Sequence, residues 1–386
     1  MIPKRFYLTA LSLLPILSAH ALVAVWALRR ARSGRISLQL WSAAVTLGTL
    51  LILVTLLADF EPGLQIPRGL MTIAQTFVNL CGPLGAVTLG LFLLFLSASK
   101  RLPPSFRQDR RTALRAIAGI GLVAPMGVAG FGVFVERTNF EICETAIPVR
   151  NLPDDLNGLR LVQISDIHLS PYLSARTLAR VVDSANELKP DFAFITGDLI
   201  TSKGDPLDEC LIQLSRLKAR GPKLGCLGNH EVYADAVDHT VREGARAGIE
   251  FLRGRARRLK IGNSALNIAG VDYEPFGPRS SYLRHAASMI EPGAFNVLLS
   301  HNPDVFPVAA AQGYDLTLAG HMHGGQVTVE ILSPALNPAR ILTPFVRGLY
   351  REGDRACYVT RGIGTLGVPA RLGSRPEITL LTLRQA

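Results

Sequence analysis

Aspartate, histidine and asparagine residues recur in five short motifs of this 386-residue sequence. The motifs are Asp166-Ile167-His168, Gly197-Asp198, Gly228-Asn229-His230-Glu231, His301-Asn302 and Gly320-His321-Met322-His323-Gly324-Gly325. They contain five of the eight histidines in the chain. Carboxylates, imidazoles and amide oxygens together suit hard to borderline divalent cations, and a carboxylate can bridge two of them. The pattern predicts a site for two metal ions without cysteine ligands.

The spacing inside two of the motifs favours shared coordination of one ion. Residues i and i+2 of an extended chain point to the same face, so Asp166 and His168 can bind the same ion. His321 and His323 repeat this spacing. An isolated Asp-x-His or Gly-Asp is more often a turn or a surface pair. The order of the motifs, and their position after apolar runs, favours a functional site over that interpretation.

The motifs follow short apolar runs that alternate with helical patterns from residue 136 onward. Strands are predicted at 159–164, 192–196, 224–227, 266–271, 295–299, 316–319, 356–360 and 378–383, and helices at 177–188, 207–217, 237–247, 282–290 and 305–311. This alternation predicts an α/β fold with largely buried strands. Ligands of open α/β sheets bind outside the carboxyl ends of the strands. We therefore expect the five motifs to meet at one edge of one sheet.

The first 135 residues differ from the rest in hydropathy. A mean hydropathy of +0.27, with 18% charged residues, is too apolar for an ordinary soluble enzyme. Four apolar stretches, 6–28, 38–58, 70–97 and 113–135, are each near the ~20 residues that a membrane-spanning helix needs. We predict a four-helix transmembrane anchor over residues 1–135 and a catalytic domain over 136–386, joined by a short polar connector near 136–150.

The net charge of +11 belongs to the apolar part of the chain. Residues 1–135 hold 13 Lys and Arg against 3 Asp and Glu, whereas the remainder holds 28 against 27. The basic excess is typical of membrane-flanking charge, so no nucleic-acid partner is expected. It is concentrated at 29–35 and 100–111, which predicts that these loops are cytoplasmic and that the catalytic domain is extracytoplasmic. The pair at 110–111 also resembles a twin-arginine export signal, although a plain cytoplasmic anchor explains it equally well.

In order and residue type, the five motifs resemble those of the calcineurin-like metallophosphoesterases. The resemblance covers roughly residues 150–385. The extension Gly324-Gly325-Gln326 after the last histidine resembles the sequence found in the subgroup of membrane-associated or exported bacterial phosphodiesterases. The resemblance to the family implies a four-layer α/β/β/α sandwich and a binuclear centre of Mn²⁺, Fe²⁺/Fe³⁺ or Zn²⁺. The implied ligands are Asp166, His168 and His323 for one ion, Asn229, His301 and His321 for the other, and Asp198 as the bridge.

The same resemblance implies catalytic roles for His230 and Asp198. His230 would face the phosphate, stabilise the transition state and protonate the leaving oxygen, while a metal-bridging hydroxide attacks phosphorus. Glu231 stands where the family often has Asp, and either acid could orient His230. The expected reaction is hydrolysis of a phosphodiester or pyrophosphate bond in a small-molecule or lipid-linked substrate, by a multi-pass protein of the bacterial inner membrane in contact with the lipid bilayer.

Other interpretations stay open at this point. One is a UDP-2,3-diacylglucosamine hydrolase of lipid A synthesis, whose cytoplasmic nucleotide substrate conflicts with the expected topology. Another is a non-catalytic metal-binding sensor or scaffold, which the complete set of motifs disfavours. A basic cluster (Arg253, Arg255, Arg257, Arg258 and Lys260) could bind phosphate or anionic lipid, or be a solvated loop or edge strand. The cysteines at 143, 210, 226 and 357 are expected to be buried apolar residues, and their pairing is undecided.

Overall fold

The computed structural model describes residues 46–55, 57, 67, 70, 74, 128, 130–328 and 337–386. The chain divides into two units, Met1–Phe131 and Gly132–Ala386. Residues 46–55 of the first unit are helical. Within the described residues, no helix combines the length and the apolar character needed to cross a membrane. Most residues of the four stretches predicted to span the bilayer lie outside the described residues, and these stretches stay a prediction.

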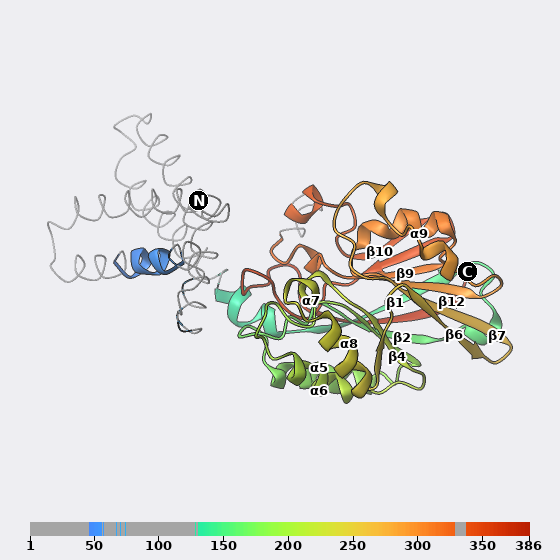
Figure 1. Cartoon of the computed structure of the whole chain (residues 1–386), viewed down its shortest axis with the longest axis horizontal. Coiled ribbons are helices and arrows are strands. Elements are labelled where there is room, and N and C mark those ends of the chain that lie inside the picture. The colour runs from blue at the N-terminus through green and yellow to red at the C-terminus, as the bar shows by residue number, and fades with distance from the viewer. Residues whose placement is uncertain are drawn as a thin grey trace, which may run out of the picture. The chain divides into compact units, whose positions relative to one another are not determined.

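The second unit, called the catalytic unit below, contains two six-stranded sheets (Figure 1). The first sheet has the order β1-β12-β2-β3-β4-β5. Its strands are β1 (Glu141–Val149), β2 (Arg160–Ile164), β3 (Phe192–Thr196), β4 (Lys223–Cys226), β5 (Ile249–Phe251) and β12 (Glu377–Gln385). Strands β2 to β5 pair in parallel, as do β1 and β12, and β12 pairs antiparallel to β2.

The second sheet has the order β10-β11-β9-β8-β7-β6. Its strands are β6 (Arg255–Ile261), β7 (Ser264–Gly270), β8 (Phe295–Leu299), β9 (Leu316–Ala319), β10 (Gly348–Glu352) and β11 (Arg355–Val359). The four inner strands are parallel, and an antiparallel strand closes each edge. Both sheets therefore present the carboxyl ends of several parallel strands, which is where a ligand site forms in such sheets.

Helices cover the outer faces of the two sheets. The α-helices are α5 (Ala175–Glu187), α6 (Leu207–Ser215), α7 (Asn229–Tyr233), α8 (Val237–Arg246) and α9 (Phe306–Gln312). Short 3₁₀ segments are η3 (Glu136–Thr138), η4 (Asp154–Leu156), η5 (Arg279–Ser281), η6 (Ala286–Met289), η7 (Pro303–Val305), η8 (His323–Gly325) and η10 (Pro338–Ile341). Figure 1 shows α5, α6 and α8 on one side of the paired sheets and α9 on the other.

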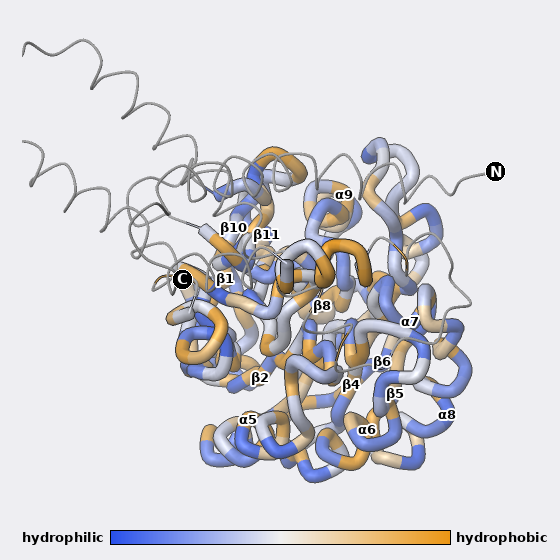
Figure 2. The backbone as a smooth tube through the Cα atoms, turned by 90° about the vertical axis from the view of Figure 1, so that its left-hand side faces the viewer, coloured by the Kyte–Doolittle hydropathy of each residue, from blue (hydrophilic) through white to orange (hydrophobic). Residues whose placement is uncertain are grey.

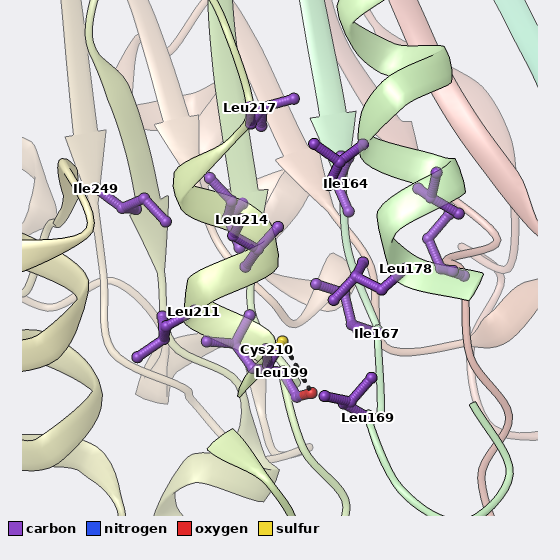
Figure 3. Close-up of a cluster of buried hydrophobic side chains, with 14 of the residues drawn as sticks. Ile164, Ile167, Leu169, Leu178, Leu199, Cys210, Leu211, Leu214, Leu217 and Ile249 are labelled. Carbon is purple, nitrogen blue, oxygen red and sulfur yellow. Dashed lines mark hydrogen bonds between the residues drawn. The ribbon is translucent and has the colours of Figure 1, made fainter. Parts of the chain in front are cut away.

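Alternate side chains of the central strands enter two different cores. In β3, Phe192 and Phe194 pack between the sheets, whereas Ala193 and Ile195 pack under the helices of the first sheet. Figure 3 shows the core under the helices of the first sheet, where side chains of α6 pack near Ile167 and Leu169, which follow β2. A strand buried on both faces has no polar side, which explains the continuous apolar runs in the sequence. The expected mixed α/β fold with two sheets is confirmed.

Three expectations about the elements are wrong. The motifs do not share one sheet, because Asp166, Asp198 and Asn229 follow strands of the first sheet while His301 and His321 follow strands of the second. Residues 141–149 form the edge strand β1 rather than a polar connector. Glu and Pro disfavour a strand there, and β1 owes its conformation to pairing with β12 from the far end of the chain. Residues 282–290 form only the 3₁₀ segment η6 instead of a helix.

Candidate metal centre

The backbone turns sharply at most of the predicted ligands. Five of them lie in the left-handed region, with φ of 50° at Asp166, 47° at His168, 56° at Asp198, 73° at His321 and 50° at His323. Such conformations cost a non-glycine residue about 1–3 kcal/mol each and persist only where the surroundings impose them. The expectation that these pairs lie on extended backbone is therefore wrong. The side chains of each Asp-x-His or His-x-His pair converge through left-handed turns after the strands.

Close approaches between loops impose these turns. The N–H groups of Asp166 and His168 donate to the carbonyls of Gly197 and Asp198, at 3.0 Å each. From the other side, the N–H of Gly364 donates to the carbonyl of Asp166 at 2.7 Å. Gly362 has φ of +66°, and a Cβ there would lie 2.4 Å from the Cβ of Asp166. Only glycine fits at that position, so the loop after β11 forms one wall of the centre.

Asp166, His168 and His323 form the first ligand group. One ligand atom from each lies within 4.8 Å of the others, and all three side chains are buried. Nε2 of His323 lies 3.1 Å from Nε2 of His168 and 3.5 Å from Oδ1 of Asp166. Two imidazole nitrogens and a carboxylate oxygen thus point at one small volume, as coordination of a cation requires.

Asp198 takes part in two further groups. It lies with His301 and His321 in one and with His168 and His230 in the other. Its Oδ2 atom is 2.9 Å from Nε2 of His301 and 3.5 Å from Nε2 of His168. A single carboxylate therefore stands between a histidine of the first ligand group and a histidine of the second.

Two buried polar atoms of the centre have no hydrogen-bond partner in the described part of the chain. They are Oδ2 of Asp166 and Oδ1 of Asn229. An unsatisfied buried polar group costs about 1–3 kcal/mol, so native proteins rarely retain one without a ligand. Nδ1 of His301 lies 2.6 Å from the carbonyl oxygen of Thr196, to which it donates, so Nε2 faces the centre, 2.9 Å from Oδ2 of Asp198. These donors fit divalent cations.

Burial and mutual charge shift the pKa values of the centre in opposite directions. Burial raises the pKa of Asp166 to about 6 and lowers the pKa values of His168 and His321 to about 3. For His301, burial opposes protonation, but Asp198 and Asp166 outweigh it and raise the pKa to about 10. Burial also opposes ionisation of Asp198, yet His301 lowers its pKa overall. In the metal-free protein, His301 and Asp198 therefore form a buried ion pair.

His230 stands at the wall of the centre rather than in its middle. The Nδ1 atom of its ring lies 2.6 Å from the carbonyl oxygen of Thr201. Its backbone N–H donates to Oδ1 of Asp198 at 2.9 Å. The ring meets those of His168 and Tyr233 edge-on, at centroid distances of 4.8 and 5.6 Å. Because Thr201 holds Nδ1, Nε2 is the ring nitrogen available to a substrate, which agrees with the role predicted for His230.

Glu231 does not orient His230, contrary to the expectation from the sequence. Its carboxylate accepts hydrogen bonds from the N–H groups of Gly228 at 2.7 Å, Asp198 at 3.0 Å and Leu199 at 2.6 Å. It ties the start of α7 to the turn after β3. The carbonyl of Thr201 holds the imidazole of His230 instead, a partner that leaves no signature in the sequence because any residue carries it.

Sequence reasoning also missed Arg371, a fully buried arginine behind the last motif. Its guanidinium donates to the carbonyls of His323 at 2.8 Å, Gly364 at 3.0 Å and Arg361 at 2.8 Å. Nη2 lies 3.1 Å from Nδ1 of His323. Arg371 therefore joins the turn that carries His323 to the loop after β11. Nothing in the local sequence marked it, because its partners are backbone carbonyls.

The other residues singled out in the sequence lie apart from the centre. The basic cluster belongs to the edge strand β6 and its approach, where Arg253 pairs with Asp272 at 2.9 Å and Arg258 with Glu291 at 2.8 Å. The basic cluster therefore lies on an edge strand, which is one of the two interpretations that the sequence left open. Cys143, Cys210, Cys226 and Cys357 are free, and the last three are buried.

Comparison with known proteins agrees with this geometry. The family model described as calcineurin-like phosphoesterase matches residues 159–325. A transmembrane protein with metallophosphoesterase domain from Danio rerio is 35% identical over 64% of this chain and 58% of its own length. The uncharacterized metallophosphoesterase YkuE of Bacillus subtilis is 31% identical over 65% of this chain and 88% of its own length. The phosphodiesterase YaeI of Escherichia coli is 27% identical over 60% and 84%.

The match with YkuE includes nearly the whole of that protein, whereas the match with the Danio rerio protein spans 58% of it. The matched family region begins just before β2 and ends at η8, so it contains all five motifs. The clustered histidines and carboxylates agree with the divalent metals that this family binds. The chain belongs to the calcineurin-like metallophosphoesterases, the family of metal-dependent hydrolases of phosphoric esters.

Proposed function

We propose that this protein is a membrane-anchored phosphodiesterase with a centre for two divalent ions. The observation that carries the proposal is the position of Asp198, whose Oδ2 atom lies 2.9 Å from His301 and 3.5 Å from His168. A carboxylate shared by two ligand groups suits ions about 3.5–4 Å apart. Imidazole, carboxylate and amide donors without thiolates favour Mn²⁺, Fe²⁺/Fe³⁺ or Zn²⁺.

The residues that would hold the ions fall into two sets around Asp198: Asp166, His168 and His323 on one side, and Asn229, His301 and His321 on the other. When bound, the ions would lower the pKa of water to about 7 and offset the negative charge of the phosphate. The unsatisfied atoms Oδ2 of Asp166 and Oδ1 of Asn229 support this assignment.

The protein's own groups would bind and protonate the substrate. His230, held through Nδ1 by the carbonyl of Thr201, can present Nε2 to the phosphate and give a proton to the leaving oxygen. Thr201 Oγ1 also lies 3.2 Å from Nδ1 of His168, so one residue positions both imidazoles. The buried ligands exclude water from the far side of the centre, which strengthens every charge interaction with the phosphate.

A phosphodiester or pyrophosphate bond is the proposed substrate linkage. The relative from Escherichia coli is named a phosphodiesterase, which supports the diester. Four apolar stretches in residues 1–135, and relatives named transmembrane proteins, support a membrane anchor. The basic loops at 29–35 and 100–111 support an extracytoplasmic catalytic unit.

Hydrolysis of bis(p-nitrophenyl) phosphate by the full chain in detergent tests the proposal. We expect turnover that requires Mn²⁺ or another divalent ion, is abolished by chelation, and returns when the ion is restored. The substitution Asp198→Asn should reduce turnover at least about 10³-fold, because it removes the shared carboxylate. The exposed Asp208→Asn, on α6, is the matched control and should change nothing. Chelator-resistant turnover would contradict a metal-dependent phosphodiesterase.

A further inference from the structure

The candidate metal centre meets solvent beside His321 and His230. Six of the seven predicted ligands are buried, whereas His321 is partly exposed. His230, which is not a predicted ligand, retains 8% exposure, while His168 and His301 retain none. Figure 1 and Figure 2 both place α7, which carries His230, at a level between α8 of the first sheet and α9 of the second. A substrate therefore reaches the centre past these two more exposed histidines.

Three aromatic side chains from two segments flank these histidines. The ring of Tyr233, the last residue of α7, lies edge-on to that of His230, with the centroids 5.6 Å apart. In the loop after β7, the ring centroids of Tyr273 and Phe276 lie 5.5 and 5.2 Å from that of His321. Tyr233 is 68% exposed and Phe276 43%. Single exposed apolar residues are common on a protein surface, but three rings at the open side of a candidate site indicate that a ligand group binds there.

Tyr273 connects the two segments that carry these rings. Its ring centroid lies 6.1 Å from that of the buried His301, in addition to its contact with His321. Burial raises the pKa of Tyr273 to about 12, and the neighbouring Tyr233 contributes to the shift. The two tyrosines therefore lie next to each other, and the phenol of Tyr273 is neutral at physiological pH. Because none of the three rings is charged, they form a wall that does not repel a phosphate ester.

Hydrogen bonds fix the loop after β7 to the segment that follows β8. The side-chain amide of Asn302 donates to the carbonyl of Glu274, which lies between the two rings of the loop in the sequence, at 2.7 Å. The carboxylate of Glu274 accepts from the N–H of Leu283 at 3.0 Å, and the hydroxyl of Tyr282 accepts from the N–H of Gly277 at 2.8 Å. Asn302 directly follows a predicted ligand, so one segment positions both that ligand and the loop. Rings held in this way lose little conformational entropy when a ligand binds.

The arrangement of the rings favours a planar aromatic ligand group over a saturated one. Tyr233 is inclined by 69° to His230 and Phe276 by 41° to His321, so neither ring forms a parallel stack with its histidine. Exposed aromatic rings bind planar groups by stacking. A saturated group instead gains most from burial in a deep apolar pocket, whereas Tyr233 and Phe276 lie at the surface.

We propose that Tyr233, Tyr273 and Phe276 form a subsite, called the aromatic subsite below, that binds a planar aromatic group of the phosphodiester. The substrate class that follows is a phosphodiester with an aryl or a nucleoside ester group. This inference rests on the proposed function, because it assumes that the phosphate binds at the candidate metal centre. Binding and hydrolysis are measured separately below, so failure of one can be told from failure of the other.

Binding of non-hydrolysable phosphonates tests the aromatic subsite without turnover. The full chain in detergent, loaded with Mn²⁺, is titrated calorimetrically with phenylphosphonate, methylphosphonate and cyclohexylphosphonate. We expect phenylphosphonate to bind at least about tenfold more tightly than methylphosphonate, because stacking on the rings adds to the shared contacts of the phosphonate. Cyclohexylphosphonate, with the same number of carbons but no planar ring, should bind more weakly than phenylphosphonate. Equal affinity for the phenyl and methyl compounds, or tighter binding of the cyclohexyl compound, would overturn the proposal.

Substitutions test whether the three rings cause the preference. Phe276→Ala and Tyr233→Ala should each reduce the preference for phenylphosphonate to below about threefold and leave the affinity for methylphosphonate within about twofold, because each removes a ring but no predicted ligand. Tyr233→Phe keeps the ring and should retain the preference. Ile212→Ala, at a side chain that is 60% exposed on α6, is the matched control. Equal weakening of both phosphonates, or an unchanged preference in both alanine variants of the subsite, would overturn the proposal.

Inhibition of bis(p-nitrophenyl) phosphate hydrolysis identifies the source of the aromatic group. Adenosine 5′-monophosphate and ribose 5-phosphate differ only by the base. An inhibition constant at least about tenfold lower for the nucleotide, with the difference lost in Phe276→Ala, assigns a nucleoside ester. Equal inhibition constants, together with the preference for phenylphosphonate, assign an aryl ester. If the wild-type chain hydrolyses no diester, the proposed function fails, and the phosphonate titrations still decide whether the aromatic subsite exists.

Discussion

The buried ion pair between His301 and Asp198 sets the chemistry of the centre at the scale of single residues. The two side chains are 2.9 Å apart and fully buried, and each favours the charged form of the other. The pKa of His301 is raised to about 10, so it is protonated at pH 7 in the metal-free protein. A histidine must be neutral to bind a metal ion. Metal ions and protons therefore compete for Nε2 of His301.

Proton release on metal binding follows from this competition. We predict that binding of Mn²⁺ at pH 7 releases about one proton from His301, and that apparent affinity falls about tenfold for each unit by which pH is lowered. Lowering the pH therefore favours the form in which His301 is protonated and no metal is bound. Isothermal titration calorimetry in buffers of different ionisation enthalpy measures the number of protons. A binding enthalpy independent of the buffer would contradict the prediction, and His301→Gln should abolish the release.

The role assigned to His230 makes a second prediction at this scale. The substitution His230→Gln should leave metal content unchanged and lower kcat about 10²–10⁴-fold, because it removes proton donation but no predicted ligand. The loss should be smaller for a p-nitrophenyl ester than for an alkyl ester, whose leaving oxygen needs a proton more. His239→Gln, at an exposed histidine of α8 paired with Asp208, is the control. Loss of metal in His230→Gln would instead make His230 a ligand, which its proximity to His168 and Asp198 also allows.

Among the elements, the turns between strands and helices decide the geometry of the centre. The sequence predicted the strands well where both faces are buried: β3, β8 and β9 have the predicted bounds, because continuous apolar runs identify them. The motifs after them identified the candidate ligands. Neither the two-sheet arrangement behind those motifs nor the left-handed turns could be read from the residues alone. The left-handed turn at Asp166 depends on contacts with the loop after β11, more than a hundred residues downstream of it.

Arg371 is the side chain that ties those distant turns together, and its loss should affect stability and metal binding at once. Arg371→Ala removes the hydrogen bonds of the guanidinium to the carbonyls of His323, Gly364 and Arg361, which should lower the free energy of unfolding by about 3 kcal/mol or more. Arg371→Lys should be intermediate in stability, because a lysine ammonium cannot donate to all the carbonyls that the planar guanidinium contacts. Thermal unfolding in detergent measures the first effect. Metal content measures the second, which should fall in both variants because the turn carrying His323 loosens.

Arg375→Lys is the matched control for Arg371, since Arg375 lies in the same loop but pairs at the surface with Glu141 at 3.0 Å. We expect it to keep wild-type unfolding temperature and metal content. A wild-type metal content in Arg371→Ala would show that the guanidinium supports folding only and does not position His323.

At the scale of the whole molecule, composition separates an apolar N-terminal third from a catalytic unit that is almost neutral. The basic loops at 29–35 and 100–111 predict that the catalytic unit is extracytoplasmic. A reporter fused after residue 386 checks this. Alkaline phosphatase should be active there and green fluorescent protein dark. The opposite pattern would place the centre in the cytoplasm and favour a nucleotide-linked substrate such as that of the lipid A hydrolases.

The two-metal centre is the central claim, and metal content per chain tests it most directly. The full chain, purified in detergent and saturated with Mn²⁺, is freed of loose ions and analysed by inductively coupled plasma mass spectrometry beside Asp198→Asn and His230→Gln. We predict two ions per chain in the wild type and in His230→Gln, and one or none in Asp198→Asn, because Asp198 lies between both ligand groups. One ion per wild-type chain, or two in Asp198→Asn, would contradict a binuclear centre bridged by Asp198.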